Sequence, residues 1–139
     1  MSRRAQTLPL KVVETEKVTI NLGHMDLGRV DLLVQEGFYS NRTDFIRTAI
    51  RNQLDRQADT VSQSVVRQSL ELGLRQYGRA ELEAVRAAGE TLDIRVLGLA
   101  VIAADVSADL ARATIGRVHV LGALQASTDV RNALRDRIR

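Results

Sequence analysis

The stretch Lys17-Val18-Thr19-Ile20-Asn21-Leu22 constrains this chain most, because polar and apolar side chains alternate strictly along it. The alternation, built largely from β-branched residues, predicts one β-strand with one face exposed to solvent. Helical patterns follow it, so the strand has no neighbour nearby in the sequence to pair with. A lone strand leaves both hydrogen-bonding edges open and buries too little apolar area to close a core. The segment therefore needs a second copy of itself.

Two helices are expected after this strand. The first covers about residues 25–36, where apolar residues recur at helical spacing, and Gly37 ends it. The second is capped by Ser40 or Asn41 and carries Asp44 in its first turn, where an acidic side chain complements the helix dipole. The sequence thus predicts a strand-helix-helix unit of about 40 residues.

Antiparallel pairing of two such strands around a twofold axis would direct their apolar side chains into a shared helical core. The side chains of Lys17, Thr19 and Asn21 would then form an outward polar platform. The predicted dimer core consists of Val18, Ile20, Leu22, Val30, Leu33, Phe45, Ile46 and Ile50.

The order of these patterns, together with the run Gly-Phe-Tyr-Ser-Asn-Arg-Thr-Asp-Phe-Ile-Arg-Thr-Ala-Ile-Arg at residues 37–51, resembles the ribbon-helix-helix (CopG-like) family over about residues 14–56. The resemblance implies an intertwined homodimer that binds double-stranded DNA, with its two-stranded ribbon in the major groove. It also implies that Lys17, Thr19 and Asn21 contact base edges. Their chemistry fits, because lysine can donate to guanine and asparagine can pair bidentately with adenine.

The same resemblance places the start of the second helix against DNA phosphates. Unpaired backbone N–H groups and the positive end of the helix dipole favour an anion there. The candidate phosphate contacts are Ser40, Asn41, Arg42 and Thr43. From spacing alone, an ordinary half-buried strand and an ordinary capped helix with no role in DNA binding would show the same patterns.

Composition limits the other possibilities. The chain has no cysteine, which excludes disulfides, thiolate nucleophiles and zinc-finger patterns. With only His24 and His119 as histidines, we expect no metal site and no cofactor. No apolar stretch is long enough for a membrane span, and residues 1–13 are interpreted as an N-terminal arm, so the protein is expected in the cytoplasm.

The pattern of residue types changes after the second helix. Residues 57–68 are polar with interspersed valines and are interpreted as a linker or a helix extension. In residues 69–139 a Leu-Gly pair recurs at spacings of 25 and then 24 residues, at Leu72, Leu97 and Leu121. Each pair lies in a β-like run, and each run is followed by a helical run.

A strand and a short helix repeated at this period are typical of a stacked solenoid, and three units suffice to bury a core. The sequence therefore predicts an α+β chain whose second part is a small αβ repeat domain, solenoid-like, for oligomerisation or protein binding. The alternative is a small α+β domain with coincidentally similar units. Asp105 and Asp129 occupy matching places in the repeats and are expected to cap the following helices. His119 is expected to be structural on a strand face, and His24 to lie in a turn near DNA.

These patterns favour a DNA-binding transcriptional regulator, in particular a repressor, that acts as a homodimer, with the repeats as a route to a higher oligomer. An antitoxin or plasmid-maintenance protein is one alternative. An architectural protein assembled by its repeats is another. No catalytic constellation accompanies the carboxylates, so an enzyme is not expected.

Overall fold

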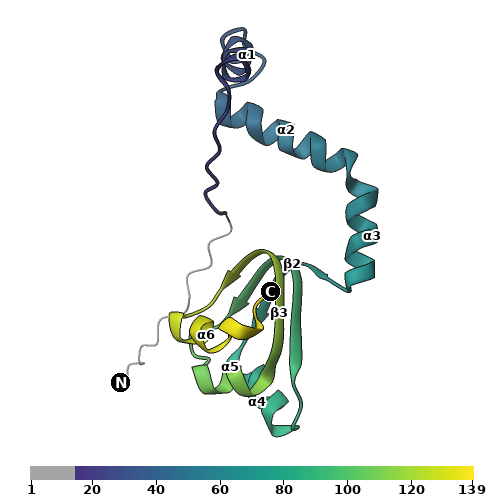
Figure 1. Cartoon of the computed structure of the whole chain (residues 1–139), viewed down its shortest axis with the longest axis vertical. Helices are drawn as coiled ribbons and strands as arrows, with labels where there is room; N and C mark the ends of the chain where they lie inside the picture. Colours follow the sequence, from purple (N-terminus) through teal and green to yellow (C-terminus); the bar gives the residue numbers. More distant parts are fainter. Residues whose placement is uncertain (1–14) are drawn as a thin grey trace, which may run out of the picture. The chain divides into compact units, whose positions relative to one another are not determined.

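The computed structural model describes residues 15–139 (Figure 1). The chain divides into two compact units, one formed by Lys17–Ser64 and the other containing Val65–Arg139. The arm expected at residues 1–13 lies outside the described residues. In chain order the elements are α1 (His24–Gln35), α2 (Arg42–Arg56), α3 (Ala58–Gln68), β1 (Glu71–Tyr77), α4 (Arg79–Ala87), β2 (Leu92–Ile102), α5 (Ala108–Thr114), β3 (Ile115–Gln125), α6 (Thr128–Ala133) and the 3-10 helix η1 (Arg135–Arg137).

The first unit contains the two predicted helices, α1 and α2. α1 ends at Gln35, and Gly37, which follows the cap residue Glu36, has a φ of 88° and donates its N–H to the carbonyl of Val34. The N–H of Phe38 donates to the carbonyl of Leu33 at 3.0 Å, which completes the hydrogen-bond pattern of a glycine C-cap. The prediction that Gly37 ends the first helix is therefore confirmed.

The expected strand at residues 17–22 has no regular secondary structure in the single chain. No hydrogen bond joins its backbone to any part of the chain that the structure describes. The difference from the prediction has a simple cause, since a strand exists only when its N–H and C=O groups pair with another strand.

Within residues 57–68, interpreted as a linker or a helix extension, residues 58–68 are helical. They form α3, which begins directly after the residue that caps the end of α2, Gln57. The boundary between the two units falls within α3, between Ser64 and Val65.

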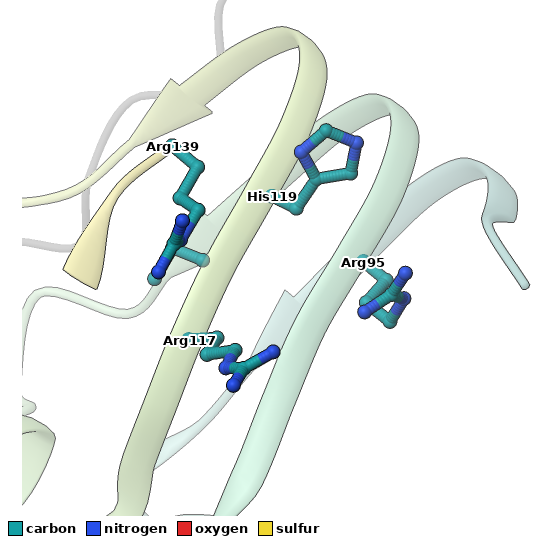
Figure 2. A pocket seen from close by; sticks show the side chains of 5 residues that line it. Arg95, Arg117, His119 and Arg139 are labelled. Carbon is teal, nitrogen blue, oxygen red and sulfur yellow. The ribbon is translucent and has the colours of Figure 1, made fainter. Parts of the chain in front are cut away.

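The second unit contains a parallel sheet with the strand order β1-β2-β3. The Leu-Gly pairs of the sequence repeat are register partners across it, so that Gly73, Gly98 and Gly122 form one row. Their φ angles are 105°, 138° and 120°, values that a side chain rarely permits. At these angles the backbone departs from extended geometry, and β2 and β3 turn over side by side as arches (Figure 2).

The row also brings neighbouring backbones too close for any side chain. A Cβ built on Gly98 would collide with the carbonyl of Gly73, and one built on Gly122 would collide with that of Gly98. At Gly98 and Gly122 the glycine thus meets two requirements, a positive φ and close approach between strands, whereas Gly73 meets only the first.

Helices α4, α5 and α6 pack with the sheet around one apolar core. Leu82 of α4, Leu110 of α5 and Val130 of α6 contribute to it and are almost fully buried. The described part of the unit is therefore a three-stranded parallel sheet packed with helices, and the predicted solenoid is not confirmed. Three parallel strands with in-register glycines account for the repeat without further stacking.

The helix caps differ from the prediction. Ser107 and Ser127 cap α5 and α6, and their hydroxyls accept from the N–H groups of Leu110 and Val130 at 3.1 and 3.2 Å. Asp105 lies before its cap and Asp129 lies inside α6, so the two aspartates are not equivalent and neither is the cap residue. The connection from β3 to α6 is shorter than that from β2 to α5, which shifts the repeat at this point.

We expect Ser107→Ala to lower the free energy of unfolding of the second unit by about 1 kcal/mol, the usual cost of losing an N-cap hydroxyl. Asp105→Ala serves as the control and should change it by less than about 0.5 kcal/mol, because Asp105 is exposed. Urea titration of both variants measures the difference. Equal losses would mean that Asp105 also supports the helix.

Candidate nucleic-acid interface

Residues 17–22 present two exposed sets of side chains. The apolar set, Val18, Ile20 and Leu22, retains 78, 58 and 41% of its accessible surface in the single chain. The polar set, Lys17, Thr19 and Asn21, is exposed as well. The two sets alternate along the segment, so an extended conformation places them on opposite faces.

The remaining predicted core residues fall into two groups. Val30 is buried in the single chain at 6% exposure. Leu33, Phe45 and Ile46 are half-buried, whereas Ile50 is exposed. α1 and α2 alone therefore cover only part of their apolar surface.

The start of α2 is held by reciprocal hydrogen bonds. The Asn41 side chain accepts from the N–H of Asp44 at 2.8 Å, and the Asp44 carboxylate accepts from the N–H of Ser40 at 2.9 Å. Tyr39 packs edge-on against Phe45, with ring centroids 5.0 Å apart. Asn41, one of the two residues predicted as the cap, is thus the N-cap, and its side-chain oxygen already accepts a hydrogen bond.

The first N–H groups of α2, those of Arg42 and Thr43, have no acceptor within the helix because of their position. The side chains of Ser40 and Thr43 are exposed beside them. The start of α2 therefore offers backbone donors and hydroxyl groups together, the combination that suits a phosphate.

Arg42 has a partner that the sequence did not suggest. Its Nε and Nη2 donate to the two carboxylate oxygens of Asp31 at 2.7 and 2.8 Å. These hydrogen bonds lower the pKa of Asp31 and raise that of Arg42, so both groups are charged at neutral pH. The pair links α1 to α2 and leaves Nη1 of Arg42 without a partner among the described residues.

A second cationic site lies in the other unit. Arg95, Arg117, His119 and Arg139 line a pocket of about 400 Å³ over β2 and β3 (Figure 2). Arg95 and His119 are register partners, each two residues before the Leu of a Leu-Gly pair, and this shared offset is the signal that sequence reasoning missed.

Within residues 15–139, no group of three or more His, Cys, Asp or Glu side chains is placed to hold a metal ion. Over the same residues, no helix combines the length and the apolar character that crossing a bilayer requires.

No curated protein and no solved structure matches the chain. The model of the ribbon-helix-helix transcriptional regulator family matches residues 13–131, which include the first compact unit and most of the second. The strand-helix-helix pattern and the αβ sheet thus lie within one family match. With that span, and with the capped helix pair in place, the chain belongs to the ribbon-helix-helix transcriptional regulator family.

Proposed function

We propose that the chain is a sequence-specific DNA-binding repressor that acts as a homodimer. The observation that carries the proposal is the segment 17–22, whose backbone forms no hydrogen bond with the described part of the chain and whose three apolar side chains are exposed. Antiparallel pairing with a second copy supplies the missing hydrogen bonds and covers the apolar face in one step. The pair of strands has the dimensions of a ribbon that the major groove accommodates.

Exposed apolar residues elsewhere in the first unit support the same dimer. Met25 and Leu32 of α1 and Ile50 and Leu54 of α2 each retain more than half of their accessible surface. Large apolar side chains exposed on both helices of one small unit are consistent with an interaction site. In the proposed dimer, helices from both copies share one core, and this surface is buried within it.

In this arrangement Lys17, Thr19 and Asn21 face the DNA bases. Their donors and acceptors match groups on base edges, so they would determine sequence preference. Nη1 of Arg42 and the free N–H groups at the start of α2 would bind phosphates and fix the register of the ribbon without reading sequence. A dimer bound in this way at a promoter excludes other proteins from it, which is the basis for proposing repression.

The roles can be separated by variants. A preferred duplex is selected with the wild-type chain from a randomised library, and affinities are then measured on it and on a scrambled duplex. Thr19→Ala and Asn21→Ala should each cost about 1–3 kcal/mol on the selected duplex and little on the scrambled one. Arg42→Ala should weaken binding to both duplexes and reduce the salt slope by about 1.

Arg51→Ala is the matched control, because Arg51 is an exposed arginine on the same helix away from its start. It should leave the discrimination between the two duplexes unchanged. Equal losses for Thr19→Ala, Asn21→Ala and Arg42→Ala on both duplexes would contradict the assignment of base and phosphate roles.

Assembly through the second unit is the other candidate function. Leu72 and Leu74 lie on β1, an edge strand of the described sheet, and their side chains are 67 and 58% exposed. An apolar edge strand can pair with another chain. A chain that forms higher oligomers and shows no preferred duplex would favour this function over the repressor.

A further inference from the structure

The pocket of the second unit gathers three arginine side chains and one histidine. Arg95, Arg117, His119 and Arg139 gather over the same stretch of β2 and β3 (Figure 2), and no Asp or Glu side chain among the described residues lines the pocket. Asp93 lies opposite Arg117 in the strand register but forms no ion pair with it. Elsewhere in this unit, arginines such as Arg112 have acidic partners.

The side chains that line the pocket differ in the hydrogen bonds that hold them. Arg95 donates from Nε to the carbonyl of Gln68 at 3.0 Å, and Nε2 of His119 lies 3.2 Å from the side-chain oxygen of the same residue. The backbone N–H of Arg139 donates to the carbonyl of Val118 at 2.9 Å, which fixes the end of the chain beside β3. The guanidinium groups of Arg117 and Arg139 have no hydrogen bond or ion pair with any described residue.

A concave site lined by one sign of charge attracts counter-ions, and the planar donor fork of arginine matches the oxygens of a phosphate group. Three arginines suit an anion with about two negative charges, as a phosphate ester has at neutral pH. The pocket volume of about 400 Å³ lies in the range of small-molecule sites, about 300–1,000 Å³.

We propose that this pocket binds a small phosphate ester, with Arg117 and Arg139 as the principal ligands and Arg95 and His119 at its other side. The ligand competes with Gln68, the last residue of α3, for Arg95 and His119. The pocket residues are separate in the sequence from the proposed DNA-reading segment 17–22. The phosphate ester would therefore act as an effector that binds outside that segment. The phosphates of DNA share this chemistry, and the test must distinguish the two sources.

The test is an NMR titration of the full chain with glucose 6-phosphate, using glucose as the neutral probe. We expect saturable shifts of the Arg117, His119 and Arg139 signals with the phosphate ester and none with glucose. Arg117→Gln and Arg139→Gln should each weaken binding at least about fivefold, since each removes a charge-assisted contact. Arg86→Gln, which removes an exposed charge on α4, is the matched control and should leave binding unchanged.

Two results would overturn the proposal. One is a set of shifts that are equal in the wild type, both pocket variants and the control, which would indicate general charge screening. The other is a loss of affinity for duplex DNA in Arg117→Gln and Arg139→Gln with unchanged binding of the phosphate ester. That pattern would assign the pocket to DNA phosphates. Thermal unfolding of each variant confirms that the second unit remains folded.

Discussion

Ile20→Glu is expected to abolish the dimer and unfold the first unit together. Ile20 occupies the middle of the apolar face of residues 17–22, and in the proposed dimer two copies of it meet in the shared core. An unpaired carboxylate buried there costs several kcal/mol in each chain, comparable to the whole stability of a small domain. Sedimentation velocity should show monomers, and circular dichroism should show the loss of helix from α1 and α2.

Thr19→Glu is the matched control, because it introduces the same charge one residue away on the polar face. It should retain the dimer and its helices, and lose DNA affinity through repulsion from phosphate. A folded Ile20→Glu dimer, or equal loss of dimer in both variants, would contradict the proposed pairing of the strands.

Gly98→Ala is expected to disrupt the sheet of the second unit. The added Cβ collides with the carbonyl of Gly73, a backbone atom that cannot move without shifting β1, and a φ of 138° is strained for alanine. We expect a loss of more than about 4 kcal/mol in the free energy of unfolding, which is exceptional for a single substitution. Urea titration of the full chain, with hydrogen exchange of β2 to assign the transition, measures it.

Gly73→Ala separates the two causes. Gly73 has a φ of 105° but no atom within 4 Å of the position of an added Cβ. Backbone strain alone should cost about 1–3 kcal/mol there. A similar cost for both variants would mean that the close approach between β1 and β2 is unimportant.

Much of the second unit could be predicted from the sequence because its signals are local and repeated. The β-like runs and the helical runs correspond to the observed strands and helices, and the Leu-Gly pairs are register partners across the sheet. The repeat did not reveal why the glycine recurs, since that depends on the carbonyl of a neighbouring strand. The helix caps predicted from the repeat were wrong, because the loop before α6 is shorter than the loop before α5.

The candidate sites also contain some features that neighbouring residues encode and others that depend on the fold. The cap at Asn41 and the alternation at 17–22 are encoded by neighbouring residues, so the sequence revealed them. The contact of Arg42 with Asp31 joins two helices across a turn, and the cationic pocket collects residues from two strands and the end of the chain. No local pattern encodes such juxtapositions, and only the fold brings these side chains together.

As a sequence-specific repressor, this family member should distinguish one DNA sequence from others. Fluorescence anisotropy of the full chain on the selected duplex and on a scrambled duplex of equal length, at about 50 and about 200 mM salt, tests it most directly. We predict tighter binding to the selected duplex by at least about 10³-fold, with a preference that persists at the higher salt. Equal affinities for the two duplexes, both lost at the higher salt, would contradict it.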